Sequence, residues 1–264
     1  MASVDKVTEC PICCETMTKP IIQCKAGHSM CKGCVTSQVI CCPICRGPMS
    51  DIRNFGLEQV IESLEKTCKV KCDYTNKGCK YLLEPRKKNA HQLECKYRKF
   101  QCEGKKFCKW ECTWMGNLDE LEKHFKGTHS NHCFMTFRTE ASLKMNLEQN
   151  FLDLHIINFH NGQNFFWYKH KVDTTNQKVY WTIQIIGTKQ TAQNYYYEFE
   201  ISQGPTRKFK VIEICENDVV DANKIFESEK CVVMSFKTLK TYLNENNELP
   251  FKFRIMSVKK HSTS

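Results

Sequence analysis

The sequence lacks two patterns that mark membrane and secreted proteins. No run of 18 or more apolar residues occurs in it, whereas a helix that crosses a bilayer needs about 20. Residues 1–5 read MASVD and lack the basic and apolar stretches of a signal peptide. We therefore expect no membrane partner and a cytoplasmic location, where thiols stay reduced, with the nucleus as an additional candidate.

The first part of the chain has few apolar residues and many cysteines. Of the 19 cysteines, 16 lie within residues 1–112. A segment with so little to bury needs another source of stability, and zinc supplies it in finger peptides, where binding of about 10–16 kcal/mol is coupled to folding. With 264 residues in all, the chain has room for about two domains and one sizeable core.

Cysteine pairs organise residues 10–45. The order C-x2-C-x10-C-x3-H-x2-C-x2-C-x7-C-x2-C gives eight soft ligands in four pairs, which suits two tetrahedral zinc ions. The ligands are Cys10, Cys13, Cys24, His28, Cys31, Cys34, Cys42 and Cys45. A disulfide-rich secreted segment is the alternative, and the missing signal peptide argues against it. The order of ligands resembles that of the RING finger.

A second metal-ligand pattern follows at residues 72–95. It reads C-x6-C-x11-H-x3-C, and its ligands are Cys72, Cys79, His91 and Cys95. The His and the last Cys lie about one helical turn apart, the spacing that points two side chains of a helix at one ion. This segment predicts a small zinc finger.

A third pattern opens six residues after Cys95, and spacing alone leaves its first ligand open. The candidate ligands are Cys102 or Cys108, then Cys112, His124 and His129. A helix is predicted over Leu118–Phe125, and the side chains near its start are acidic. They are Asp119, Glu120 and Glu122. Carboxylates there would repel phosphate groups, so we expect a structural or protein-binding role and no nucleic-acid partner.

The formal net charge of +10 does not indicate a nucleic-acid-binding protein either. The predicted sites carry more thiolate charge than metal charge, so their loading lowers the net charge by about four. The remaining positive charge is spread along the whole chain and forms no concentrated patch in the sequence.

Residues 52–67 predict a short amphipathic helix between the RING-like segment and the fingers. Apolar residues recur there at i, i+3, i+4 and i+7. They are Leu57, Val60, Ile61 and Leu64. Asn54 is a candidate N-cap. A solvated linker is the alternative for a helix this short.

From about residue 130 the chain alternates apolar and polar residues in short runs, which predict strands. The predicted strands are Phe165–Val172, Val179–Gly187, Tyr195–Ser202, Phe209–Ile214, Cys231–Phe236 and Phe251–Val258. Only one helix is expected, over Lys237–Asn244. This composition predicts an antiparallel β-sandwich, with Cys133, Cys215 and Cys231 as core residues.

Taken in order, the RING pattern, the two fingers and the β-rich region resemble one family, the seven in absentia (SINA/SIAH) ubiquitin ligases. The resemblance runs from about Cys10 to Met256 and includes CCPICRGP at Cys41–Pro48. In the β-rich region the matching residues are Ile186, Gly187, Thr188, Ala192, Asn194, Tyr197 and Glu200.

The resemblance implies an α+β multidomain protein. Its parts would be a zinc-stabilised RING finger over residues 1–50, a helical linker over 51–71, tandem SIAH-type zinc fingers over 72–129, and a TRAF-like β-sandwich over 130–264 that binds substrates and forms a dimer. Four zinc ions are expected, two of them in the RING finger.

The resemblance also implies how the zinc ligands are shared. In the RING cross-brace, the first and third pairs hold one ion and the second and fourth pairs hold the other. The sets are Cys10, Cys13, Cys31 and Cys34, and Cys24, His28, Cys42 and Cys45. The six residues between Cys95 and Cys102 match the family's spacing between fingers, which favours Cys102 over Cys108. The gap from Cys102 to Cys112 is three residues longer than the family's.

As a function, the resemblance implies a RING-type ubiquitin ligase in protein degradation by the proteasome, with no covalent ubiquitin intermediate. Ile12 and Pro43 match the platform for a ubiquitin-charged conjugating enzyme, and Arg46 matches the linchpin position that contacts both enzyme and ubiquitin. One further platform position, usually apolar, is Gln38 here, with Val39 beside it. A non-catalytic adaptor that scaffolds or competes for substrates is the alternative.

The resemblance places substrate binding on an edge strand of the β-sandwich, which would take up short extended motifs of substrates or adaptors. The family's edge strand carries a Trp, and the matching segment here is Leu154–Ile157. His155 and Ile157 are the candidate substrate-binding residues. With His155 in place of the Trp, the pocket wall would be smaller and more polar. A homodimer through the same domain is expected.

Overall fold

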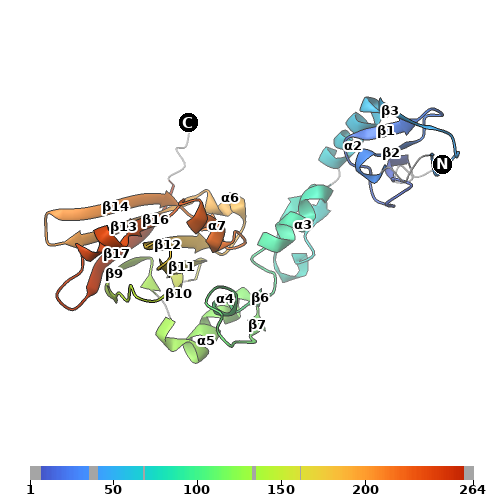
Figure 1. Ribbon diagram of the computed structural model, residues 1–264. Coiled ribbons are helices and arrows are strands. Elements are labelled where there is room, and N and C mark those ends of the chain that lie inside the picture. Colours follow the sequence, from blue (N-terminus) through green and yellow to red (C-terminus); the bar gives the residue numbers. More distant parts are fainter. Residues whose placement is uncertain (1–6, 36–40, 68, 133–134, 161, 259–264) are drawn as a thin grey trace, which may run out of the picture. The chain divides into compact units, whose positions relative to one another are not determined.

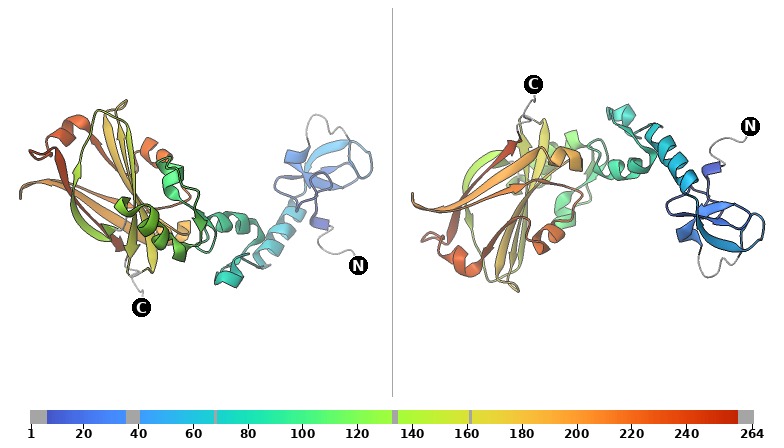
Figure 2. Two further views of the ribbon diagram at one scale, coloured as in Figure 1. Left: turned by 90° about the horizontal axis from the view of Figure 1, so that it is seen from below. Right: turned by 90° about the horizontal axis from the view of Figure 1, so that it is seen from above.

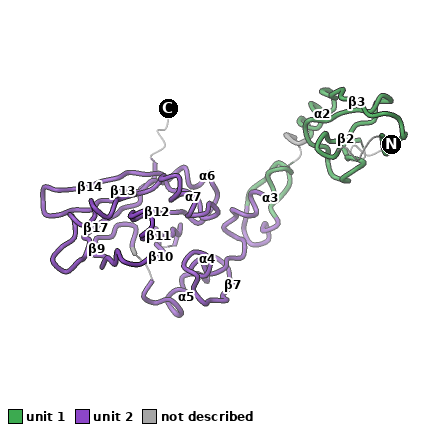
Figure 3. The backbone as a smooth tube through the Cα atoms, viewed as in Figure 1, with its two compact units in different colours: residues 1–72, 80–88 green, residues 73–79, 89–264 purple. Residues whose placement is uncertain are grey.

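The computed structural model describes residues 7–35, 41–67, 69–132, 135–160 and 162–258. The chain folds as two compact units (Figure 3). Unit 1 comprises Met1–Cys72 and Lys80–Lys88, and unit 2 comprises Asp73–Cys79 and Asn89–Ser264. Within the described ranges, no helix is long and apolar enough to cross a membrane.

Unit 1 is built on a small antiparallel sheet in the order β2-β1-β3. Its elements are β1 (Ile21–Cys24), β2 (Ser29–Cys31), the short helix η1 (Lys32–Cys34), β3 (Met49–Arg53) and α2 (Phe55–Thr67). The core is small and contains Met17, Ile21 and Met30 beside buried cysteines. So few apolar side chains leave bound metal as the main source of stability, as the composition predicts.

Helix α2 packs on this sheet through Ile61, whereas Val60 is exposed. The Leu57 N–H donates to Asn54 Oδ1 at 3.0 Å, which confirms Asn54 as the N-cap. The predicted start of the helix at residue 52 is wrong. Residues 52 and 53 belong to β3, where Arg53 pairs with Ile22 of β1, so the helix begins only after the strand ends.

The two finger segments contribute short elements. The first contains β4 (Val70–Lys71) paired with β5 (Leu82–Leu83), the short helix η2 (Thr75–Lys77) and helix α3 (Pro85–Glu94). The second contains β6 (Phe100–Gln101) paired with β7 (Met115–Gly116), helices α4 (Glu103–Phe107) and α5 (Leu118–Thr128), and η3 (Ser130–His132). The helix predicted over Leu118–Phe125 is confirmed, and it continues to Thr128.

Two β-sheets pack face to face in the C-terminal part of unit 2 (Figures 1 and 2). One has the order β15-β12-β11-β10-β8, with β16 also paired to β12, and the other has the order β14-β13-β17-β9. The strands are β8 (Met135–Thr136), β9 (Arg138–Lys144), β10 (Phe151–Phe159), β11 (Asn164–Asp173), β12 (Lys178–Ile185), β13 (Tyr195–Gln203), β14 (Arg207–Ile214), β15 (Glu216–Asn217), β16 (Val232–Ser235) and β17 (Glu248–Ser257). Apart from the parallel pairs β10–β8 and β12–β15, neighbouring strands are antiparallel, which confirms the predicted sandwich.

The sheet that contains β10, β11 and β12 is buried on both faces. Tyr168 and Trp181 lie in the cluster that packs against the second sheet. Leu154 and Trp167 lie in a separate cluster with the second finger and with helix α7 (Ala222–Glu227). Because both faces are covered, β11 and β12 are buried along nearly their whole length.

The prediction of a single helix in the β-rich region is wrong. Beside α7, the structure has α6 (Lys189–Ala192) and α8 (Phe236–Lys240), and α8 ends before the predicted Asn244. These helices are too short to show a helical period in the sequence. Cys215 and Cys231 are buried, as predicted for core residues, and Cys133 lies outside the described residues.

Candidate metal centres and protein-binding surfaces

The eight predicted RING ligands gather in two groups of four in unit 1. The ligand atoms of each group lie within 4.8 Å of one another. The groups are Cys10, Cys13, Cys31 and Cys34, and Cys24, His28, Cys42 and Cys45. The chain therefore alternates between the two groups, which is the sharing that the RING resemblance implies.

The chemistry of these groups fits a divalent soft metal. Desolvation acts to raise the pKa of Cys24, yet the N–H groups of His28 and Ala26 lower it to about 6, so this sulfur is a thiolate at neutral pH. In the other group, desolvation and the neighbouring thiols raise the pKa of Cys34 to about 12. A bound cation relieves this repulsion, because a coordinating thiol is deprotonated outright.

Two tight turns carry the C-x2-C pairs at either end of the RING segment. Cys14 and Arg46, each directly after the second Cys of a pair, adopt left-handed backbone angles with φ of 57°. Their N–H groups donate to the carbonyls of Cys10 and Cys42 at 2.9 and 2.8 Å. The turn around the last pair thereby places Arg46 in an exposed position next to a ligand.

The predicted conjugating-enzyme platform is partly displayed. Pro43 and Arg46 are exposed, and Ile12 is half-buried against the RING core. Ile44, which the sequence reasoning did not single out, is 55 % exposed beside Pro43. Its place inside the last C-x2-C pair, next to Pro43, is the sequence signal that could have found it. Gln38 and Val39 lie outside the described residues.

The first finger brings its predicted ligands together as well. Cys72, Cys79, His91 and Cys95 are all buried, with ligand atoms within 4.8 Å of one another. His91 lies on α3, and its Nε2 is 3.4 Å from Cys79 Sγ. Burial lowers the pKa of His91, so the ring is neutral and can donate a lone pair to a metal.

In the second finger the structure groups Cys102, and not Cys108, with the other candidate ligands. The group is Cys102, Cys112, His124 and His129. Cys102 Sγ lies 3.4 Å from His129 Nε2, and Cys112 Sγ lies 3.6 Å from His124 Nε2. Burial lowers the pKa of His124 and His129. Cys108 lies outside the group, and burial raises its pKa to about 12.

Helix α5 of this finger packs on the sandwich. Leu121 and Phe125 are buried, and the Phe125 ring lies 5.4 Å from that of Trp167 on β11. Of the acidic side chains at the helix start, Glu120 accepts the Asn117 N–H at 2.7 Å. The apolar face of α5 is therefore covered by the sheet, and its first turn is acidic, which agrees with the expected structural or protein-binding role.

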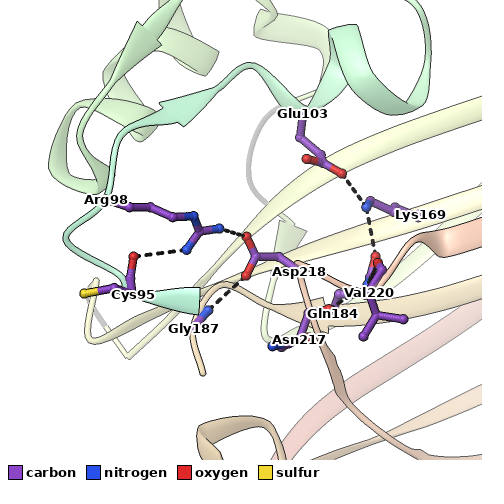
Figure 4. A network of polar contacts seen from close by, with 9 residues as sticks. All are labelled: Cys95, Arg98, Glu103, Lys169, Gln184, Gly187, Asn217, Asp218 and Val220. Carbon is purple, nitrogen blue, oxygen red and sulfur yellow. Dashed lines mark hydrogen bonds and ion pairs between the residues drawn. The ribbon is translucent and has the colours of Figure 1, made fainter. Parts of the chain in front are cut away.

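Two buried ionic contacts tie the second finger segment to the sandwich (Figure 4). Lys169 Nζ of β11 lies 2.5 Å from Glu103 of α4 and 2.8 Å from Gln184 of β12. Gln184 in turn donates to the carbonyls of Asn217 and Val220, both at 2.8 Å. At the other contact, Arg98 pairs with Asp218, which also accepts the Gly187 N–H. Hydrogen bonds and ion pairs therefore join the finger to the sheet at two places.

Strand β10 has the position of an edge strand over most of its length. It pairs with β11 from Phe151 to Phe159, whereas β8 covers only Ile157 and Asn158. Among the described residues, no second strand lies beside β10 from Phe151 to Ile156, and we call this stretch the uncovered part. His155 lies in it, with its side chain 17 % exposed and bonded to Asp153. The assignment of the Ile157 side chain to substrate binding needs correction, because this side chain is 0 % exposed and lies in the sandwich core.

The fold and the ligand groups define a multidomain protein with three parts: a RING finger, a zinc-finger segment and a TRAF-like domain. Three family models match: the E3 ubiquitin-protein ligase sina/sinah RING finger over residues 10–45, the Sina zinc finger over 59–142, and the Sina TRAF-like domain over 157–253. The chain belongs to the seven in absentia (SINA/SIAH) family.

Three curated relatives show how far the likeness extends. The chain is 30 % identical over 215 residues to E3 ubiquitin-protein ligase siah-1 of Caenorhabditis briggsae, which covers 78 % of this chain and 47 % of the relative. It is 28 % identical over 207 residues to sina of Drosophila virilis, covering 76 % and 62 %. It is 26 % identical over 245 residues to sina of Schistosoma mansoni, covering 90 % and 62 %. The chain thus spans about half to three fifths of these relatives' lengths.

Proposed function

We propose that the protein is a RING-type ubiquitin ligase that holds a ubiquitin-charged conjugating enzyme at the RING finger and a substrate at the β-sandwich. The observation that carries this proposal is the exposed turn around the last RING ligand pair, where Pro43 and Arg46 stand beside two ligands of one group. Relatives named E3 ubiquitin-protein ligase, matched over RING and TRAF-like parts, support it.

In this proposal the RING finger acts by positioning and forms no bond to ubiquitin. A flexible thioester-linked ubiquitin is held in one reactive pose, which lowers the entropic part of the barrier. The apolar side chains of Ile12, Pro43 and Ile44 contact the conjugating enzyme. Arg46 holds enzyme and ubiquitin together, because its planar guanidinium offers several N–H donors in a fixed fork.

Zinc maintains the geometry that this positioning needs. Four groups of four ligands support four zinc ions per chain, two in the RING finger and one in each small finger. The turn that ends at Arg46 carries the ligands Cys42 and Cys45, so loss of the metal at that group would free the turn. A structural zinc site with four protein ligands leaves no open position for chemistry.

For substrates, we propose β-strand addition at β10. The uncovered part, from Phe151 to Ile156, offers backbone groups to an extended peptide, and alternate side chains give specificity. His155 contributes a small polar wall in place of the family's Trp. A homodimer through the sandwich is supported by β14, an edge strand with Ile212 and Ile214 exposed. Degradation by the proteasome is the expected outcome for substrates.

A non-catalytic adaptor is the second candidate. It is favoured by the polar Gln38 at a platform position and by the altered edge strand. The two candidates differ in whether a charged conjugating enzyme loses its ubiquitin faster when the protein is present.

The test is a single-turnover discharge of ubiquitin from a charged conjugating enzyme to free lysine. The proposal expects faster discharge with the wild-type protein and a loss of about tenfold or more with Arg46→Ala, since one charge-assisted contact contributes about 1.5–3 kcal/mol. Arg46→Lys is the matched variant, because it keeps the positive charge but lacks the planar guanidinium. Its discharge rate should lie between those of the wild type and Arg46→Ala. Equal discharge with and without the wild-type protein would favour the adaptor.

A further inference from the structure

A fifth cluster of potential metal ligands lies outside the RING and finger groups. His132, Asp153 and His155 bring one ligand atom each to within 4.8 Å of one another. His132 Nδ1 is 3.1 Å from Asp153 Oδ1, and His155 Nε2 is 3.0 Å from Asp153 Oδ2. Each carboxylate oxygen therefore faces a different imidazole.

The three side chains come from two elements of unit 2 that meet at the exit of the second finger. His132 ends η3, three residues after the last finger ligand, and Asp153 and His155 project from the same face of β10. The cluster is sheltered: the Asp153 side chain is 9 % exposed, and the Trp110 ring lies 4.5 Å from that of His132.

The Asp153 carboxylate is held in its charged form, because desolvation acts to raise its pKa but the His155 bond and the neighbouring imidazoles lower it to about 2. Its recorded ion-pair partners are the two imidazoles. The lysines nearest in register, Lys169 and Lys171, alternate to the other face of β11 and pair with Glu103 and Asp173. The carboxylate and the two imidazoles that flank it together offer three donor atoms to a cation.

A further imidazole faces the cluster without a partner of its own. His170 pairs in register with Asp153 across β10 and β11, so both side chains lie on the same face of the sheet. His170 is 2 % exposed, and within the part of the chain that the structure describes neither of its ring nitrogens has a hydrogen-bond partner. Buried polar groups are nearly always satisfied by protein, water or an ion, so this imidazole adds an available nitrogen donor or acceptor beside the cluster.

From this geometry we infer that His132, Asp153 and His155 form a fifth metal site, which takes a zinc ion and leaves one coordination position open. Two imidazoles and one carboxylate are a donor set that zinc accepts, with bonds of about 2.0–2.2 Å that set ligands about 3.3 Å apart in a tetrahedron. One ligand atom from each of the three residues lies within 4.8 Å of the others, so small side-chain rotations would bring all three to one ion.

Such a site would fasten the exit of the second finger to β10. It would also place a metal with a free position beside the uncovered part of β10, where a water molecule or a donor side chain of a partner can complete the coordination. The site contains no thiolate, and its chemistry therefore differs from that of the four Cys-containing groups.

This difference allows a direct test on the full chain. Cobalt replaces zinc in both kinds of site, and only the thiolate sites give an intense sulfur-to-cobalt charge-transfer band. We expect the wild-type protein to bind one equivalent beyond those that produce this band, and to release that equivalent first to a mild chelator, because it has three protein ligands and no thiolate.

Two variants assign the extra equivalent. Asp153→Asn and His155→Gln should each weaken it by at least about 100-fold, since even changes beyond the direct ligands lower metal affinity 10–100-fold. The charge-transfer band of the thiolate sites should keep its intensity in both variants, which shows that the fingers remain folded. The matched control is His160→Asn, because His160 is an exposed histidine outside the cluster, with a left-handed φ of 46° that Asn tolerates.

Uptake of no equivalent beyond the thiolate sites in the wild-type protein would overturn the inference and leave a metal-free hydrogen-bonded His–Asp–His chain. An extra equivalent that both variants retain would overturn it too, because the ion would then lie elsewhere. A shortfall in the thiolate band itself would count against the four proposed zinc sites and not against this one.

Discussion

Lys169 Nζ lies 2.5 Å from a carboxylate oxygen of Glu103, and the two side chains are only 2 % and 11 % exposed. One belongs to the sheet and the other to the second finger, so the pair joins the two. We predict that Glu103→Ala destabilises unit 2 by about 3–5 kcal/mol, because it leaves a buried ammonium without its counter-charge. Urea unfolding followed by tryptophan fluorescence measures this, since Trp114 and Trp167 lie on the two sides of the contact.

Two controls make this prediction specific. Replacing both partners, with Lys169→Met and Glu103→Leu, should recover most of the stability, because no buried charge remains. Glu229→Ala removes the partner of Lys178 in an exposed pair, with side chains 37 % and 50 % exposed, and should cost at most about 1 kcal/mol. A loss at Glu103 no larger than that at Glu229 would contradict a role for the buried pair.

The second prediction concerns the ligands of the second finger. Cys102→Ser should lower the zinc content by one ion per chain, and Cys108→Ser should leave it unchanged, because Cys102 and not Cys108 belongs to the four-ligand group. Metal analysis of the two purified variants decides between them. The reverse pattern would mean that this finger follows the ordinary two-Cys, two-His spacing.

The third prediction concerns the thiolates of the RING finger. Cys31→Ser should release zinc and open the RING sheet locally, because a site with a missing ligand is weakly held and its folding is coupled to the metal. Faster hydrogen exchange in β1 and β2 together with reduced zinc content is the expected readout. Cys14→Ser is the control, since Cys14 is an exposed cysteine in the same segment and outside both groups. Equal zinc content in the two variants would contradict the assignment.

The fourth prediction concerns the attachment of α2. Glu58 accepts the Ile21 N–H at 2.8 Å and two bonds from Arg53 at 2.8 and 2.9 Å. The Arg53 bonds and the Ile21 N–H lower the pKa of Glu58 from 4.5 to about 2. The stabilising contribution is therefore present above about pH 4.5 and is lost as the pH falls towards 2.

Glu58→Gln should loosen α2 from the RING sheet at neutral pH and speed exchange of the Ile21 amide. Glu62 lies on the same helix as Glu58 and forms an exposed ion pair with Lys19. Glu62→Gln should therefore have little effect. Exchange at Ile21 that is equally fast in both variants would show that the Glu58 bonds do not hold the helix.

The sequence predicted elements with a strong period and ligands with a strict spacing. The sandwich strands around Trp181 and Tyr197 followed from alternation, and the Asn54 cap followed from its position before an apolar helix face. Strand β9 was not predicted, because its sequence RTEASLK offers little apolar alternation and its residues are half-buried at most.

The contacts between second finger and sandwich could not be predicted in the same way. Lys169 and Glu103 are 66 positions apart, and nothing local distinguishes the buried Lys169 from Lys171, which is partly exposed. His132 and Asp153 meet only because β10 lies against the exit of the finger. Such pairs depend on tertiary packing, which local patterns in a single sequence do not reveal.

The central claim is that the RING finger promotes ubiquitin transfer. The most direct measurement is an autoubiquitylation assay with the full chain, ubiquitin, activating enzyme and a panel of conjugating enzymes, with Cys31→Ser in parallel. We predict ubiquitin conjugates with at least one conjugating enzyme, and none with Cys31→Ser, which lacks an intact metal group. No conjugates with any member of the panel, from a wild-type protein whose RING and finger sites are filled with zinc, would contradict the claim.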